Sequence, residues 1–208
     1  FKVVHHRLTE ESRGTSSWRW PIIEVVESGY GIATCYAGDF APDHKRHFRE
    51  GILRWSKTKR RFKHHQPGAI AAWAWGLNQM LSVLENAPEI SNVPKIVLGH
   101  SRLGKAALWA GVQDTRWDMV ISNNSGCMGA AQSKRPVGED VYRITKRFPY
   151  WFAPRLKHYA KREGQFKLDQ QMLLVYQYLK KLMFMDIMVM IEIQELLVHY
   201  SHSIVLQK

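Results

Sequence analysis

The stretch from residue 93 to residue 105 constrains the fold of this chain most strongly. Residues 93–98 form a short apolar run typical of a buried strand, and a Gly-His-Ser turn follows directly. Residues 103–112 then have the apolar spacing of a helix. A serine in the middle of so tight a strand–turn–helix connection predicts a nucleophile elbow, which lifts the hydroxyl of Ser101 clear of the sheet.

The residues beside Ser101 fit this interpretation. Gly99 and Gly104 supply the small residues that a close approach of strand and helix requires, although the common G-x-S-x-G pattern has its second glycine where this chain has Leu103. The helix that leaves the turn directs free N–H groups and its positive dipole end toward the serine. The N–H of Arg102 can therefore donate to an oxyanion, a contact worth about 2.7–4 kcal/mol of barrier.

Strand and helix signals alternate from Pro21 to Ser122. Residues 21–29 read as a short helix, 30–36 as a buried strand, 69–86 as an amphipathic helix and 117–122 as another strand. The polar and basic residues 43–66 are predicted to form a long loop. The alternation predicts an α/β fold with a mostly parallel sheet.

Composition excludes several other classes of protein. Lys and Arg number 30 against 18 Asp and Glu, which gives a net charge of +12, and 45% of residues are hydrophobic. The densest basic run, residues 57–65, contains a single aromatic side chain, so a nucleic-acid stacking platform is not expected and a solvated loop that favours acidic polysaccharide is preferred. No apolar run reaches the length of a membrane-spanning helix, so no membrane partner is expected.

Cysteine and histidine usage argues against a metal site. Two cysteines exclude a multi-cysteine zinc module, and the adjacent pairs His5-His6 and His64-His65 do not share a helix or strand face. Cys35 is predicted to be a free, buried thiol on the strand of residues 30–36. Of the neighbouring tryptophans Trp73 and Trp75, the first is predicted to lie in the core and the second to be covered by a neighbouring element.

Longer blocks around the elbow resemble the glucuronoyl esterases of carbohydrate esterase family 15, in particular its bacterial branch. The S-R-x-G-K pattern that starts at Ser101 separates this family from most α/β-hydrolases. The blocks are GHSRLGKAALWAG at 99–111, ISNNSGC at 121–127, AAWAWGL at 71–77, FPYWF at 148–152 and LDQQMLL at 168–174.

This resemblance implies a three-layer α/β-hydrolase fold and hydrolysis of esters between lignin alcohols and the 4-O-methyl-glucuronic acid of xylan. Ser101 would be the nucleophile, and Arg102 would stabilise the oxyanion with its side chain as well as its backbone. Lys105 and Glu139 would bind sugar hydroxyls. The partner would be a glucuronoxylan–lignin ester, the enzyme a monomer without cofactor, and its location secreted or periplasmic.

The resemblance covers roughly residues 13–175 and then stops. We therefore expect a partial hydrolase domain over residues 1–175 and a divergent, Met-rich tail over 176–208, explained either by a frameshifted or wrongly joined reading or by a lineage-specific tail. The C-terminal strands and the loop with the catalytic histidine are expected to be missing, so the chain alone should be nearly inactive. Asn124 stands where some members carry the triad acid. Asp186 with His199 or His202 could substitute, but we favour ordinary structural roles for these three.

Two other functions stay open at this stage. The first is a non-catalytic hydrolase-fold protein that binds acidic glycans, which a missing histidine would favour if the chain were the whole molecule. The second is another serine esterase, such as an acetyl or feruloyl esterase. The S-R-x-G-K elbow together with Glu139 favours the glucuronoyl esterase over this last alternative.

Overall fold

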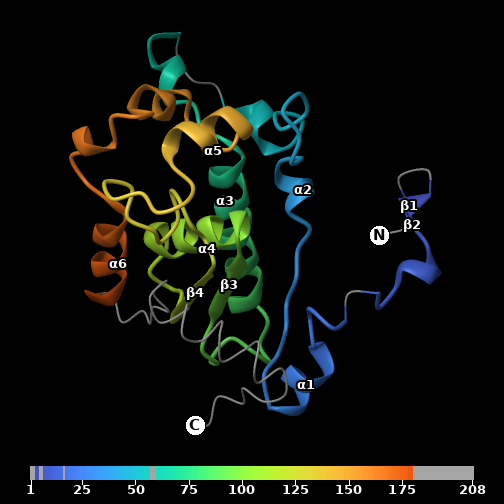
Figure 1. Ribbon diagram of the computed structural model, residues 1–208. Helices are drawn as coiled ribbons and strands as arrows, with labels where there is room; N and C mark the ends of the chain where they lie inside the picture. The colour runs from blue at the N-terminus through green and yellow to red at the C-terminus, as the bar shows by residue number, and fades with distance from the viewer. Residues whose placement is uncertain (1–2, 5–6, 16, 57–59, 180–208) are drawn as a thin grey trace. The chain divides into compact units, whose positions relative to one another are not determined.

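The computed structural model describes residues 3–4, 7–15, 17–56 and 60–179, which belong to two compact units (Figure 1). The first unit reaches Thr34 and the second begins at Cys35. The first unit contains the antiparallel strands β1 (Val3–Val4) and β2 (Arg7–Leu8), the 3₁₀ helix η1 (Glu10–Ser12) and the helix α1 (Ile22–Glu27).

Helix α1 confirms the predicted helix near residues 21–29. Pro21 stands directly before it, and Gly29 follows with a φ of +87°, a left-handed backbone that glycine adopts without strain. The strand predicted for residues 30–36 is wrong, because these residues form no strand and are exposed. Within the described residues they have no partner strand, and an apolar run without a partner cannot form a ladder. Cys35 is consequently a free but exposed thiol rather than a buried one.

The second unit holds most of the secondary structure (Figure 1). Its elements are α2 (Ala37–Phe40), η2 (Ile52–Trp55), η3 (Arg60–His65), α3 (Ala69–Glu85), β3 (Ile96–His100), α4 (Arg102–Gln113), β4 (Met119–Asn123), α5 (Val141–Arg147), η4 (Pro154–Tyr159), η5 (Glu163–Gln165) and α6 (Gln170–Leu179). The region 43–66 is mainly loop, as predicted, with two short 3₁₀ turns in it.

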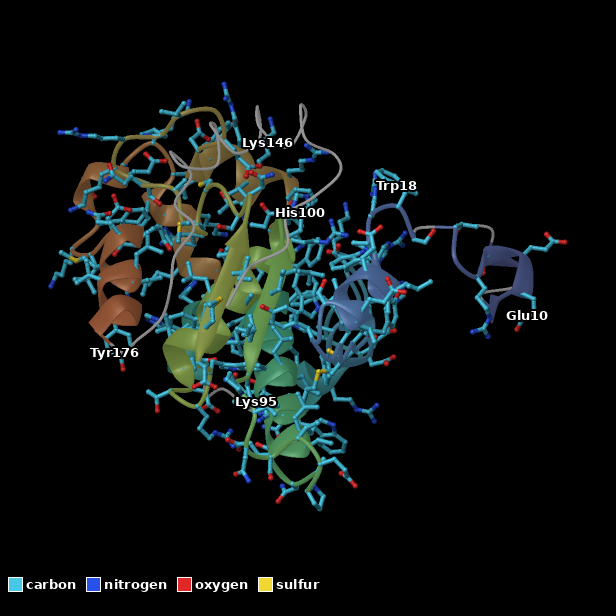
Figure 2. The ribbon with its side chains drawn as sticks, turned by 90° about the horizontal axis from the view of Figure 1, so that it is seen from below. Glu10, Trp18, Lys95, His100, Lys146 and Tyr176 are labelled. Atoms are coloured by element: carbon cyan, nitrogen blue, oxygen red, sulfur yellow. The ribbon has the colours of Figure 1, made fainter. Side chains whose placement is uncertain are left out.

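Strands β3 and β4 pair in parallel, which confirms the predicted pairing geometry. Both lie slightly later in the chain than predicted. β3 begins after Pro94, which has no N–H to give to a ladder, and it continues through Gly99 and His100 because these residues pair with Ser122 and Asn123. The carboxyl end of β3 therefore leads directly into the elbow; Figure 2 labels Lys95 before the strand and His100 at its end.

Two helices cover one face of this sheet. Leu81 of α3 and Ala107 of α4 pack with Val97 and Val120 in one buried cluster. On the opposite face Leu98 is 49% exposed. The described residues thus show two layers, and the third layer of the predicted three-layer arrangement stays a prediction.

The N-terminus of α3 is held by the segment before η4. The N–H of Ala69 donates to the carbonyl of Tyr150 at 2.9 Å and that of Ile70 to the carbonyl of Trp151 at 3.2 Å, so two of the helix's free donors are satisfied. Trp73 is buried as predicted, whereas Trp75 is 45% exposed. Trp75 makes an edge contact with Phe40, but this ring does not cover it.

Over the described residues, no helix has both the length and the apolar character needed to cross a lipid bilayer.

Candidate active site

Ser101 lies at the junction of β3 and α4 with a strained backbone. Its φ of 55° and ψ of −121° are rare for a residue with a side chain, and such outliers persist only where the surroundings enforce them. Here the Ser101 N–H donates to the carbonyl of Asn123 at 2.9 Å, and the Ser101 carbonyl accepts from the N–H of Lys105 at 3.2 Å. The strand–turn–helix geometry predicted from the sequence is therefore present.

Two glycines allow this junction to be so tight. A Cβ at Gly99 would lie 2.1 Å from the carbonyl oxygen of Leu103, and one at Gly104 would lie 3.0 Å from the carbonyl oxygen of Asn123. The Ser122 hydroxyl also donates to the Gly104 carbonyl at 2.9 Å, which ties the helix to β4. Leu103 is exposed, so no small residue is needed there, and this explains the departure from the G-x-S-x-G pattern.

Arg102 begins α4 and carries its guanidinium beside the elbow. Its Nε lies 2.8 Å from Oδ2 of Asp43, and its side chain is 48% exposed. The other carboxylate oxygen of Asp43 accepts from the Tyr150 hydroxyl and from the Trp151 indole N–H, each at 2.8 Å. The sequence analysis did not identify Asp43, because no local sequence pattern indicates a contact between residues more than fifty positions apart.

Lys105 follows Ser101 by one helical turn and is only 6% exposed. Its ammonium donates to the carbonyl of Ser125 in the loop after β4. Burial lowers the pKa of Lys105 below its ordinary value, and the nearby Glu139 carboxylate partly offsets this by raising it. A buried ammonium has three N–H donors, and the described residues offer it a single hydrogen-bond acceptor.

Glu139 lies in an exposed loop before α5 and is close enough to interact electrostatically with Lys105. The structure thus brings Ser101, Arg102 and Lys105 together on one helix end, with Glu139 near the lysine. Cys127 is also within electrostatic reach of Lys105, but burial raises the pKa of its thiol to about 12, so it stays protonated and inert.

The described residues include no hydrogen-bond partner for the Ser101 hydroxyl. The adjacent His100 is exposed and has its Nδ1 3.3 Å from the Asn123 side-chain amide. Asn124, at the position of the triad acid in some relatives, is exposed with a φ of +46°. The three alternative triad residues from the sequence, at positions 186, 199 and 202, lie outside the described residues.

No group of three or more metal-ligating side chains occurs in the part of the chain that the structure describes.

Comparison with known proteins identifies the family of this chain. A model of the family described as "Glucuronyl esterase, fungi" matches residues 60–186, which is more than half of the chain. The chain belongs to the glucuronoyl esterase family, carbohydrate esterase family 15. Among curated relatives, the prokaryotic carbohydrate esterase MZ0003 is 42% identical over 177 residues, covering 84% of this chain and 40% of the relative. A 4-O-methyl-glucuronoyl methylesterase of Neurospora crassa is 32% identical over 119 residues, covering 52% of this chain and 30% of the relative.

Solved structures of glucuronoyl esterases agree with this assignment and favour its bacterial branch. A promiscuous family 15 esterase from a marine bacterial metagenome superposes with a TM-score of 0.77 at 40% identity, covering 88% of this chain and 47% of that one. The glucuronoyl esterase of Solibacter usitatus gives 0.76 at 37% identity, covering 85% and 46%. The described unit is thus part of an α/β-hydrolase fold, and the chain spans less than half the length of these relatives.

Proposed function

We propose that this chain carries the nucleophile, the oxyanion-stabilising groups and the sugar-binding lysine of a serine esterase. Its substrates would be esters between the 4-O-methyl-glucuronic acid of xylan and lignin alcohols. The observation that carries the proposal is the strained Ser101 elbow, with Arg102 and Lys105 within one helical turn of it, in a chain of the glucuronoyl esterase family.

The proposed reaction follows from this arrangement. The Ser101 hydroxyl oxygen attacks the ester carbonyl carbon while its proton passes to a general base. The oxyanion that forms accepts from the Arg102 N–H and faces the Arg102 guanidinium, which stabilise it before the intermediate expels the alcohol with a proton. Water then hydrolyses the glucuronoyl ester on Ser101 and regenerates the hydroxyl.

A serine hydroxyl is a weak nucleophile without an adjacent base, and none is hydrogen-bonded to Ser101 within the described residues. We therefore propose that the base and its acid lie outside residues 1–175. Turnover of benzyl glucuronate would be measured for the 208-residue chain and for a chimera that joins residues 1–175 to the C-terminal part of MZ0003.

We expect the chain alone to be at least about 100-fold slower than the chimera, the smaller end of what a general base contributes. Rates within tenfold of each other would show that this chain supplies its own base. Absence of turnover in both proteins, while both are folded, would count against the esterase itself.

Lys105 is expected to donate a hydrogen bond to a hydroxyl of the sugar, since an esterified uronate has no charge and must be recognised through its hydroxyls. In the chimera, Lys105→Met keeps the buried methylenes but removes the donors. We expect at least about a tenfold loss in kcat/KM on benzyl glucuronate, because the variant leaves a hydroxyl of the bound sugar without its donor. The loss on an aryl acetate should be less than about threefold, because this substrate has no sugar hydroxyl.

Glu139→Gln provides the comparison for Lys105→Met. Glu139 is exposed, so its substitution should give the same selectivity with a smaller loss. Equal losses on both substrates for Lys105→Met would mean that the lysine supports the elbow and does not recognise the sugar.

The location of the protein follows from the substrate. An ester within the plant cell wall lies outside any cell, so we propose a secreted or periplasmic enzyme. We further propose that it acts as a monomer. One relative is described as promiscuous, and acetyl or feruloyl esters are therefore the second substrate class to assay.

A further inference from the structure

The Arg102 guanidinium is paired with Asp43 on its Nε side. Its Nε lies 2.8 Å from Oδ2 of Asp43 in the ion pair, and the described residues include no hydrogen-bond partner for either Nη. An arginine tethered in this way presents its two terminal N–H groups as a fork, the arrangement that binds an anionic or carbonyl oxygen best.

Asp43 is itself fixed on the side away from Arg102. Tyr150 and Trp151 both donate to its Oδ1, which leaves Oδ2 to face the arginine. Burial, with a further contribution from the Asp43 carboxylate, raises the pKa of Tyr150 to about 12. Its hydroxyl therefore stays protonated, and stays a donor, throughout the neutral range.

The groups that hold Asp43 belong to the rigid core of the unit. Trp151 is buried and stacks on Phe148, with ring centroids 3.7 Å apart. Two residues before Asp43, the carbonyl of the buried Ala41 accepts from the Trp73 indole N–H at 2.8 Å. The Asp43 loop is thus anchored at two neighbouring points by tryptophans of the core.

The charges are arranged so that Arg102 keeps its electrostatic effect. A bare carboxylate beside the guanidinium would cancel much of its positive potential at the elbow. Two neutral donors on Oδ1 draw part of the negative charge of Asp43 away from Arg102. The carboxylate can then orient the arginine while the outer nitrogens remain effective toward a developing oxyanion.

We propose that Asp43 is a positioning residue, which holds the Arg102 side chain against the elbow with its Nη fork directed at the reacting carbonyl oxygen. This rests on the roles proposed above for Ser101 and Arg102 and not on the identity of the ester, because the same fork would serve any oxyanion formed at Ser101. Without Asp43 the guanidinium samples several rotamers, and its contribution to the oxyanion is diluted.

The first test observes the tether directly in the 208-residue chain. The Nε–H signal of Arg102 is assigned in ¹⁵N NMR spectra as the one that disappears in Arg102→Lys, and its hydrogen exchange is measured. We expect Asp43→Asn, which keeps the shape but removes the charge, to accelerate this exchange at least about tenfold. Unchanged exchange would overturn the proposal.

A matched control removes the same kind of charge from the other end of α4. Asp114 is the C-cap of α4 and forms an ion pair with Arg116 at 2.6 Å. With a helical rise of 1.5 Å per residue, it lies about 18 Å from Arg102 along the helix. Asp114→Asn should leave the Arg102 exchange rate unchanged. Equal acceleration by both variants would indicate general loosening of the helix and would contradict the specific tether.

The second test asks whether Asp43 acts through Arg102. The protein used is the chimera with the C-terminal part of MZ0003, because labelling needs a base beside Ser101. An uncharged alkyl fluorophosphonate forms a bond between Ser101 Oγ and phosphorus, with loss of fluoride and the serine proton, and the rate of labelling is followed by intact mass. We expect Asp43→Asn to slow labelling about 5- to 50-fold, and to have no further effect when Arg102→Ala is already present.

An equal slowing in both backgrounds would make Asp43 a structural residue. Equal labelling rates of the parent chimera and its Arg102→Ala variant would remove Arg102 from the mechanism. Either result overturns the proposal. The reagent contains no sugar. Loss of glucuronate ester turnover with the labelling pattern intact would therefore refute the proposed substrate and leave the role of Asp43 standing.

Discussion

Ser101→Ala is expected to lower the turnover of benzyl glucuronate by about 10³-fold or more in the chimera with the C-terminal part of MZ0003. Alanine keeps the elbow backbone but has no oxygen to attack the carbonyl, and loss of a serine nucleophile typically leaves only the residual effect of the oxyanion hole and of binding. The measurement is kcat on benzyl glucuronate, with circular dichroism and thermal unfolding to confirm that the variant is folded.

Substrate affinity provides the control for this variant. Because Lys105 and Glu139 are untouched, the dissociation constant for a glucuronate ester should stay within about threefold of that of the parent. Retention of more than a tenth of the parental kcat would assign the nucleophile to another residue.

Gly99→Ala should have the largest effect on stability. The new Cβ would lie 2.1 Å from the carbonyl oxygen of Leu103 and 2.4 Å from its carbonyl carbon, both backbone atoms of α4. Neither can move without separating the helix from the strand, so we expect a loss of at least about 4 kcal/mol in the free energy of unfolding, or failure to fold. Urea unfolding of the 208-residue chain measures this loss.

Gly164→Ala is the matched control for Gly99→Ala. Gly164 lies in η5, and a Cβ there would meet no atom within 4 Å. The free energy of unfolding of the Gly164→Ala variant should differ from that of the parent by less than about 1 kcal/mol. Surface substitutions that meet no close contact usually have small effects. A Gly99 variant as stable as the Gly164 variant would mean that the elbow is looser than described.

The elbow could be predicted from the sequence because its determinants are local. An apolar run, a small turn and an amphipathic helix lie within twenty residues, and each signal acts over one or two turns of chain. The same holds for α3, whose predicted bounds differ from Ala69–Glu85 by a single residue. The parallel pairing of β3 and β4 followed from the helix between them, since such a crossover places two strands side by side.

The prediction for residues 30–36 failed for a physical reason. A mainly apolar run has strand propensity, but a strand exists only with a hydrogen-bonded neighbour, and propensity contains no information about neighbours. The assignment of Cys35 as buried depended on that strand and failed with it.

The immediate surroundings of the elbow could not be read from the sequence. Asp43 pairs with Arg102 while Tyr150 and Trp151, more than a hundred residues later, hold its other oxygen. The burial of Lys105 likewise depends on the loop after β4, which supplies the Ser125 carbonyl. Sequence spacing predicted that Lys105 follows Ser101 by one helical turn, but it contained nothing about how deeply the lysine is buried.

The central claim is that Ser101 carries the glucuronoyl group during hydrolysis, and trapping that ester tests it most directly. The chimera would be quenched in acid during turnover of benzyl glucuronate, digested and examined by peptide mass spectrometry. A glucuronoyl ester on Ser101, absent from Ser101→Ala, is the predicted result. Continued turnover with no adduct at Ser101, or with the adduct on another side chain, would contradict it.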